Sequence, residues 1–305
     1  MADDLRAWAV AWEDAAFGSD GFYGRALAEE HFATRVTDGD AVARRLVDLI
    51  SPDLERLVSR HGSATVTDAG AGSGLLLQQL AAVLPASLAG RVTLRAIDVR
   101  ARPVHLPDEI AWVHADVRDV GTRVDAAPGV VVAHELLDDI PCDVVETDDD
   151  GVRRLVLVDP TTGREELGPS LGSKAACAAL GVDAARLDRW CDTWWPRRRA
   201  AARIEVGSAR DDTWRALTDI ISDGLAIAID YGHIRSDRDV GVWDGGTLVG
   251  YRDGRICRPV PDGRCNITAH VALDACAGSL PSEGHTPTLQ RESSDMWWLL
   301  QRVGR

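Results

Sequence analysis

Several residue patterns that define common protein classes are rare or missing in this chain of 305 residues. Lys174 is the single lysine among 34 basic residues, so chemistry through a lysine Schiff base would depend on that residue alone. None of the 6 cysteines forms a C-x-x-C pair, which argues against zinc and dithiol motifs and favours small buried thiols in a reducing compartment. No apolar run reaches the roughly 18 residues that a membrane-spanning helix requires.

Positive charge is scarce relative to negative charge. The 48 acidic and 34 basic residues leave a net charge of −14, and so acidic a surface repels nucleic-acid phosphates and anionic lipid. We therefore expect no nucleic-acid partner and no membrane partner. The N-terminal segment carries acids where a secretory signal has basic residues, which predicts a cytoplasmic protein. The oligomeric state is left open, with a homodimer among the alternatives.

Apolar runs alternate with helix-length connections along most of the chain. Segments typical of buried parallel strands occur at 64–70, 92–98, 110–116, 129–135 and 225–232. Helices are predicted at 3–16, at about 41–62, at about 74–85, at about 208–222 and around Trp190, Trp194 and Trp195. In the second of these, Asp40 is placed to cap the helix and Ser51-Pro52 to interrupt it. Residues 143–159 form two β-rich runs around Asp150-Gly151, which is a hairpin signal.

A glycine motif follows the first of these strands directly. It reads Asp68-Ala-Gly70-Ala-Gly72-Ser-Gly74 and lies where the strand gives way to a helix. Glycines at such a junction let the chain turn tightly and let a ligand approach the backbone. A dinucleotide fingerprint would place Gly or Ala at position 75, which is Leu75 here. The carboxylate of Asp68 would also repel a pyrophosphate, whereas it would attract the sulfonium and ammonium groups of S-adenosylmethionine.

Two further acids stand at the ends of the next two strands. Asp98 ends the second strand, where a carboxylate can accept hydrogen bonds from both ribose hydroxyls, and Asp116 ends the third, where it can bind the adenine amino group. Each could instead cap a helix. Because open α/β sheets bind ligands at the carboxyl edge, three acids at three successive strand ends favour a ligand site.

Five motifs in order along the chain resemble the MidA-like class I S-adenosylmethionine-dependent methyltransferases. They are DAGAGSGLL (68–76), AHELLDDIPCDVVE (133–146), IEVGSARDDTWRALTDIISDGLAIAIDYGH (204–233), GTLVGYRDG (246–254) and NITAHVALDA (266–275). The chain departs from the family pattern at His134, where Asn is usual, and at Asn266, where Asp is usual. The N-terminal family element survives only faintly, in His31–Arg35, and the region after Thr288 is short. Trp297 and Trp298 are expected to pack rather than to bind.

The resemblance implies an α/β, Rossmann-like fold with a mostly parallel seven-stranded sheet in the order 3-2-1-4-5-7-6, flanked by helices and carrying an inserted substrate region. It divides the chain into an N-terminal helical cap (1–62), a cofactor-binding core (63–142), a hairpin and helical insert for the substrate (143–203) and the C-terminal part of the core (204–305). The cofactor implied is S-adenosyl-L-methionine. Its expected binding residues are Asp68, Gly70, Gly72, Gly74, Asp98, Asp116, Val117 and His134, and no metal is expected.

The resemblance also implies an acceptor side of the site. A relative methylates a protein arginine, and a guanidinium pairs well with carboxylates, so we expect Glu135 to hold the acceptor with help from Asp138. His233 and His270 are further catalytic candidates, although each could be a hydrogen-bonded structural residue. Alternatives remain open: a factor that binds the donor without turnover, a small-molecule methyltransferase with His134 or His233 as general base, and a nicotinamide oxidoreductase. The Trp190–Trp195 helix with Arg197–Arg199 could contact a partner, or simply bury its tryptophans.

Overall fold

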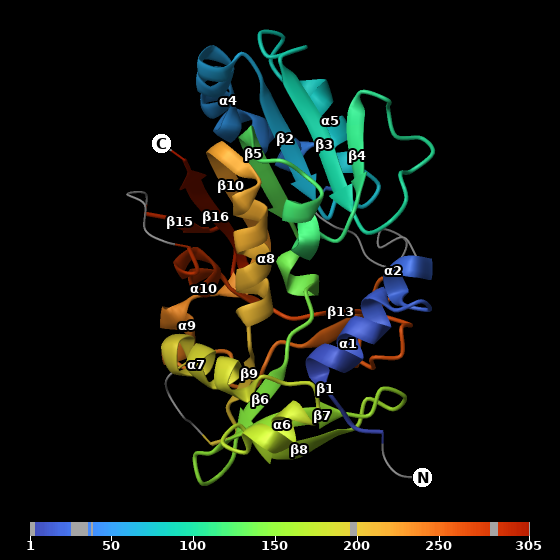
Figure 1. Ribbon diagram of the computed structural model, residues 1–305, viewed down its shortest axis with the longest axis vertical. Helices are drawn as coiled ribbons and strands as arrows, with labels where there is room; N and C mark the ends of the chain where they lie inside the picture. Colours follow the sequence, from blue (N-terminus) through green and yellow to red (C-terminus); the bar gives the residue numbers. More distant parts are fainter. Residues whose placement is uncertain (1–3, 26–35, 38, 196–199, 281–285, 305) are drawn as a thin grey trace. The chain divides into compact units, whose positions relative to one another are not determined.

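Figure 1 shows the computed structural model, which describes residues 4–25, 36–37, 39–195, 200–280 and 286–304. The chain divides into two compact units. The glycine-loop unit comprises Leu27–Leu137, Asp212–Asp230 and Ser279–Arg305, and the hairpin unit comprises Met1–Ala26, Asp138–Asp211 and Tyr231–Gly278. The expected segment 1–62 contributes to both units, whereas the expected insert 143–203 lies wholly in the hairpin unit.

A mostly parallel sheet forms the centre of the glycine-loop unit. Its strands are β2 (Ala64–Ala69), β3 (Val92–Asp98), β4 (Ile110–His114), β5 (Ala127–His134), β10 (Ile221–His233), β15 (Thr288–Arg291) and β16 (Met296–Val303). They lie in the order β4-β3-β2-β5-β10-β16-β15, which is 3-2-1-4-5-7-6 when these seven are numbered along the chain. The first five pair in parallel, and β15 pairs antiparallel with β16. This confirms the predicted fold class and strand order.

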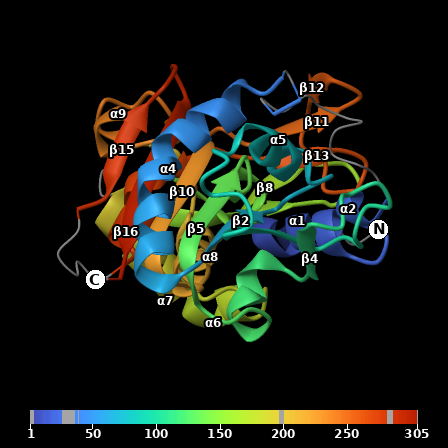
Figure 2. The same cartoon turned by 90° about the horizontal axis from the view of Figure 1, so that it is seen from above.

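The apolar composition of these strands explains the sheet. Val130, Val131 and Val132 of β5 are each at most 2% exposed, as expected for a central strand that is covered on both faces. Helices α4 (Ala41–His61) and α5 (Leu75–Val83) pack against β2, β5 and β3, and Figure 2 shows α4 running beside the sheet. Trp297 and Trp298 of β16 are 4% and 2% exposed, which confirms that they pack in the core.

Helix α4 differs from its prediction in two ways. It continues through Pro52 without interruption, because its buried residues Leu46, Ile50, Leu54 and Leu57 form one apolar stripe on both sides of the proline. Asp40 occupies the N-cap position, but its carboxylate makes no capping bond and instead accepts a hydrogen bond from Arg44 Nη2 at 2.6 Å.

The hairpin unit contains two small antiparallel sheets. The first combines β1 (Arg6–Ala7), β6 (Val144–Thr147), β7 (Arg153–Val158), β8 (Glu165–Ser170) and β9 (Arg203–Glu205), and β6 with β7 confirms the predicted hairpin. The second has the order β12-β11-β13, with β11 (Val249–Arg252), β12 (Arg255–Cys257) and β13 (Asn266–Thr268). The first helix, α1 (Trp8–Phe17), begins later than predicted because Arg6 and Ala7 pair with β7.

Short helices complete the two units. They are α2 (Phe22–Arg25), η1 (Val117–Thr122), η2 (Leu137–Asp139), α6 (Lys174–Ala178), α7 (Ala184–Trp194), α8 (Ser208–Asp219), α9 (Arg235–Asp239) and α10 (Leu273–Gly278), with the short strand β14 (Val271–Ala272) beside the end of β10.

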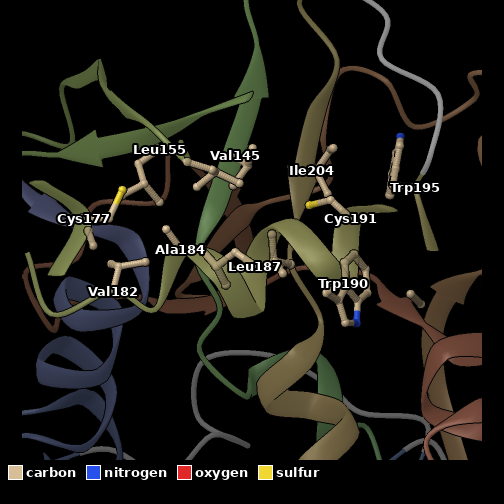
Figure 3. Close-up of a cluster of buried hydrophobic side chains, with 14 of the residues drawn as sticks. Val145, Leu155, Cys177, Val182, Ala184, Leu187, Trp190, Cys191, Trp195 and Ile204 are labelled. Carbon is tan, nitrogen blue, oxygen red and sulfur yellow. The ribbon is translucent and has the colours of Figure 1, made fainter. Parts of the chain in front are cut away.

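A buried cluster holds α7 against the first small sheet, as Figure 3 shows. It includes Val145 and Leu155 of the hairpin and Leu187, Trp190 and Cys191 of α7. Trp190 also donates from Nε1 to Asp211 Oδ2 at 2.8 Å, so its role here is in packing. All six cysteines are free thiols and five of them are buried, as expected. The faint family element at 31–35 and Arg197–Arg199 lie outside the described residues.

Candidate functional site

The glycine motif forms a tight loop between β2 and α5. Gly70, Gly72 and Gly74 have φ angles of 73°, 59° and 77°, in the left-handed region that favours glycine. A Cβ at Gly70 would lie 2.6 Å from Leu136 Cδ1, and one at Gly74 would lie 2.5 Å from Leu106 Cδ1. Gly74 occupies the N-cap of α5, so the free N–H groups of the first helical turn face the loop. Protein side chains therefore leave no room for a Cβ at Gly70 or Gly74, while Gly70 and Gly72 remain partly exposed.

Asp98 connects this loop to the end of β3. Its Oδ2 accepts a hydrogen bond of 2.8 Å from Gly72 N–H, and its Oδ1 accepts from Arg100 N–H at 2.9 Å and Arg100 Nε at 3.1 Å. The residue is 6% exposed. A carboxylate has about four lone-pair positions, so Asp98 retains capacity to accept from ribose hydroxyls next to the glycine loop.

Asp68 lies beneath the loop and is 4% exposed. Burial raises the pKa of its carboxyl group to about 8, and the nearby negative charge of Asp98 contributes in the same direction. A buried carboxyl group of this kind becomes a carboxylate readily only when a cation is brought close to it. The sulfonium and ammonium groups of S-adenosylmethionine are such cations, so this donor fits the chemistry of the loop.

Asp116 caps the 3-10 helix η1. Its carboxylate accepts from Arg118 N–H at 2.8 Å and from Arg118 Nε at 3.0 Å. Burial alone would raise the pKa of Asp116, but the hydrogen bonds and charge of Arg118 lower it below its ordinary value. Asp116 is thus an ionised helix cap, and its Oδ2 also accepts from Arg118 Nε and Nη2. Val117, the first residue of η1, is 5% exposed.

The segment after β5 has a constrained backbone. Glu135 has a φ of 48°, which is uncommon for a residue with a side chain. Its N–H donates to Ile229 O at 2.8 Å, and the buried carboxylate of Asp230 accepts from Leu136 N–H at 3.3 Å and Leu137 N–H at 2.8 Å. These bonds hold the Glu135 backbone in place. The Glu135 side chain is 9% exposed, and its Oε1 lies 3.6 Å from His134 Nε2.

The acids that follow belong to the hairpin unit. Asp138 is 6% exposed, and its backbone carbonyl accepts from Ala269 N–H at 3.1 Å. Asp139 accepts a hydrogen bond from the Tyr23 hydroxyl at Oδ2 and from Asn266 Nδ2 at 2.9 Å at Oδ1. The departure from the family pattern at Asn266 therefore has a physical reason, because an amide donates to Asp139 where a second carboxylate would repel it.

Both candidate histidines also lie in the hairpin unit. His233 is 2% exposed, and its Nδ1 accepts from Arg238 Nη1 at 2.9 Å. Burial, and then the positive charge of Arg238, hold the pKa of His233 well below its ordinary value, so its imidazole is neutral. This bond agrees with the structural alternative for His233, and its catalytic role stays a prediction. His270 is partly exposed, and its backbone carbonyl accepts from Arg210 Nη1 at 2.7 Å.

Two residues were not identified as important from the sequence. Asp230 orders the segment after β5, and its signals in the sequence were its place at the end of the apolar run LAIAID and within the family motif at 204–233. Arg210 is 1% exposed and donates to the carbonyls of Asp138, Ile140 and His270, so it ties the acidic segment to the ITAH segment. Nothing in the local pattern around position 210 indicated this.

The comparisons with known proteins agree with this geometry. The model of the family described as "Putative S-adenosyl-L-methionine-dependent methyltransferase" matches residues 53–284, which is most of the chain. The chain belongs to this family. The resemblance to MidA-like methyltransferases is thereby confirmed, as is S-adenosyl-L-methionine as the cofactor of this methyltransferase. No curated protein matches the chain significantly.

Two solved structures share the fold of this methyltransferase. One is a "likely methyl transferase" from Burkholderia thailandensis, bound to S-adenosyl-homocysteine. It is 21% identical in sequence, with a TM-score of 0.68, and the match covers 93% of this chain and 73% of that chain. The other is an uncharacterized protein from the same organism. It is 20% identical, with a TM-score of 0.64, and the match covers 93% of this chain and 72% of that chain.

Among the described residues, none of the helices could span a membrane. No group of three or more His, Cys, Asp or Glu side chains in the same residues is arranged to hold a metal ion.

Proposed function

We propose that this methyltransferase acts on a guanidinium nitrogen of a protein arginine. S-adenosylmethionine supplies an electrophilic methyl group. In the proposed site Gly70, Gly72 and Gly74 present the backbone to the donor, while Asp98, Asp116 and Val117 bind its adenosine and Asp68 faces its positive charge. His134, at the carboxyl end of β5, is proposed to border the donor.

The observation that carries the acceptor proposal is the constrained backbone at Glu135. A φ of 48° in a residue with a side chain costs free energy, and the bonds to Ile229 and Asp230 compensate for it. Such strain is typical of functional positions. We infer that it serves to direct the Glu135 carboxylate at the acceptor.

The chemistry follows from the properties of guanidinium. With a pKa above about 12, it pairs with a carboxylate through two parallel hydrogen bonds. Glu135 would localise the positive charge and leave one nitrogen aligned for in-line attack, which is largely an effect of orientation. One N–C bond forms as the S–C bond breaks, and the acceptor nitrogen loses a proton to solvent or to a carboxylate.

Replacing the carboxylate by an amide tests this assignment. We expect Glu135→Gln to bind S-adenosylmethionine as wild type does and to lose transfer by about 10²-fold, the scale of removing one preorganised electrostatic contact. The measurement is transfer of labelled methyl from the donor to arginine-containing peptides, followed by identification of methylarginine after hydrolysis. The matched control is Glu109→Gln, an exposed acid of the same unit. A Glu135→Gln rate equal to wild type would remove Glu135 from the mechanism.

A small-molecule acceptor is the second candidate, and the contact between His134 and Glu135 favours it. A carboxylate 3.6 Å from an imidazole can orient that imidazole toward a hydroxyl or carboxyl acceptor, for which it would act as general base. In this case His134→Gln would abolish transfer to such acceptors, and peptides would remain unmethylated. Donor binding without any transfer would instead favour a regulatory role.

A further inference from the structure

Three partly exposed aromatic rings gather in the hairpin unit. Tyr231 is the first residue of the part of β10 that belongs to this unit, Trp243 follows α9, and His270 lies between β13 and β14. The His270 ring is stacked against Tyr231 at 6.3 Å and 20°, and it meets Trp243 edge-on at 4.7 Å and 72°. We call Tyr231, Trp243 and His270 the aromatic surface.

Buried polar groups fix the position of this surface. His270 N–H donates to Thr247 Oγ1 at 2.8 Å, and Thr247 N–H donates to Glu205 Oε1 at 3.0 Å. Arg210 binds the His270 carbonyl at 2.7 Å. Glu205 and Arg210 are 3% and 1% exposed. The rings are therefore preorganised, and a ligand that stacks on them would lose little free energy in ordering them.

The loop that carries Trp243 is also ordered, and it exposes apolar side chains. Its backbone bonds run from Gly241 N–H to Arg238 O at 3.0 Å and from Gly246 N–H to Trp243 O at 2.9 Å. Val240 and Val242, on either side of Gly241, are 72% and 59% exposed. Two exposed valines thus flank Gly241 in the segment that leads to the partly exposed Trp243.

The chain itself shows how a guanidinium fits against rings in this unit. The Arg238 guanidinium lies 5.6 Å from the centre of the Trp195 ring, donates to His233 Nδ1 and forms a bidentate pair with Asp274 at 2.7 and 3.0 Å. The His233 ring lies 6.3 Å from Trp243. The Arg238 guanidinium thus lies among the buried rings of Trp195 and His233. The aromatic surface adjoins these rings through Trp243 and is partly exposed.

We propose that the aromatic surface, with Val240 and Val242, binds the acceptor polypeptide. An arginine side chain of the acceptor would stack on the rings through cation–π contact, and apolar residues beside it would cover the two valines. The net charge of −14 favours a cationic segment over an acidic one. This proposal rests on the proposed function, because it supposes that the acceptor is a protein arginine.

Direct peptide binding tests the proposal without requiring turnover. The probe is a fluorescein-labelled Gly-Leu-Arg-Leu-Gly peptide, compared with the same peptide carrying citrulline in place of arginine. Its anisotropy is titrated with full-length protein saturated with S-adenosylhomocysteine. We expect Trp243→Ala to weaken binding about tenfold, within the range of a desolvated cation–π contact. The double variant Val240→Ser with Val242→Ser should weaken it severalfold, and citrulline should do the same in wild type.

Controls separate binding from folding. Ile256, in β12 of the same unit, also has an exposed aliphatic side chain, with 71% of its surface accessible. The control variant Ile256→Ser should bind the peptide as wild type does. Trp243→Phe keeps an aromatic ring and should retain most of the affinity. It therefore tests the ring even if Trp243→Ala folds poorly. The valine double variant changes only exposed side chains.

The outcomes distinguish this proposal from the proposed function. Equal affinity of wild type, Trp243→Ala and the valine double variant, or no binding of the peptide by wild type, would overturn the docking surface. If wild type methylates the peptide with a KM that Trp243→Ala leaves unchanged, the docking surface is wrong and the proposed function stands. If the peptide binds as expected but receives no methyl group, the surface stands and the arginine acceptor is wrong.

Discussion

The carboxylate of Asp230 accepts a hydrogen bond of 2.8 Å from the backbone N–H of Leu137, 93 residues earlier in the chain. Asp230 is 0% exposed and also accepts from Leu136 N–H. A buried carboxylate in the last third of β10 thus holds the chain after β5, directly beside Glu135. Asp230 has no need to contact a substrate in order to influence the reaction.

We therefore expect Asp230→Ala to act on both stability and transfer. The buried N–H of Leu137 would lose its acceptor, at a cost of about 1–3 kcal/mol, the partly buried N–H of Leu136 would lose its acceptor too, and Glu135 would lose its constrained conformation. Urea unfolding and methyl transfer measure the two effects. Asp230→Asn keeps one acceptor oxygen and should recover part of both, while exposed Asp219→Ala should change neither. Wild-type transfer in Asp230→Ala would show that the segment is ordered by other contacts.

The glycine loop allows a matched pair of substitutions. Gly74 and Gly90 have φ angles of 77° and 73°, but a Cβ at Gly74 would meet Leu106, whereas a Cβ at Gly90 would meet nothing within 4 Å. Alanine at either position should cost about 1 kcal/mol in backbone strain. Only Gly74→Ala should also weaken S-adenosylhomocysteine binding, by more than tenfold in calorimetry. Equal binding by the two variants would mean that the loop does not approach the cofactor.

The buried carboxyl group of Asp68 predicts a pH dependence. Its pKa rises from about 4 in the unfolded chain to about 8 in the folded protein, so the folded state binds more protons between these values. The contribution of Asp68 to the free energy of unfolding is therefore largest below about pH 4 and decreases as the pH rises toward 8. Asp68→Asn removes the titration, so its stability relative to wild type should be higher at pH 8 than at pH 5, by at least about 1 kcal/mol.

Urea unfolding of Asp68→Asn at the two pH values measures this difference, with exposed Asp108→Asn as the control. The donor should add a second signature, because its positive charge lowers the pKa of Asp68 and releases a proton at pH 7. Calorimetry in buffers with different ionisation enthalpies detects such a proton. A parallel pH dependence in wild type and Asp68→Asn would mean that Asp68 is ionised in the free protein.

Asn266→Asp restores the residue that is usual in the family and should destabilise this protein. The new carboxylate would lie beside Asp139 Oδ1, where Asn266 Nδ2 now donates at 2.9 Å. We expect a loss of about 1–3 kcal/mol at pH 7 and a smaller loss near pH 4, where one of the two acids is protonated. Gln290→Glu makes the same charge change at an exposed position and should be neutral. Unchanged stability at pH 7 would contradict the pairing of Asn266 with Asp139.

Much of the glycine-loop unit could be predicted from local patterns. Five apolar runs, each followed by a turn or helix signal, identified the parallel strands, and the glycine motif located the loop after β2. The position of Asp98 at the end of β3 followed from the same pattern. These features depend on periodicity and on glycine geometry, and both are written within a few consecutive residues. The family motifs added the order of the strands and the cofactor.

Contacts between distant residues could not be predicted in this way. Asp230 with Leu137, Arg210 with His270 and Asn266 with Asp139 join residues 93, 60 and 127 positions apart. No local period encodes such a pair, because each polar group could satisfy its hydrogen bonds with many partners in the unfolded chain. The sequence alone determined the sheet, the glycine loop and the kind of cofactor. Tertiary packing alone decided which of these polar groups meet, since only the folded chain removes water and brings each of them to its particular partners.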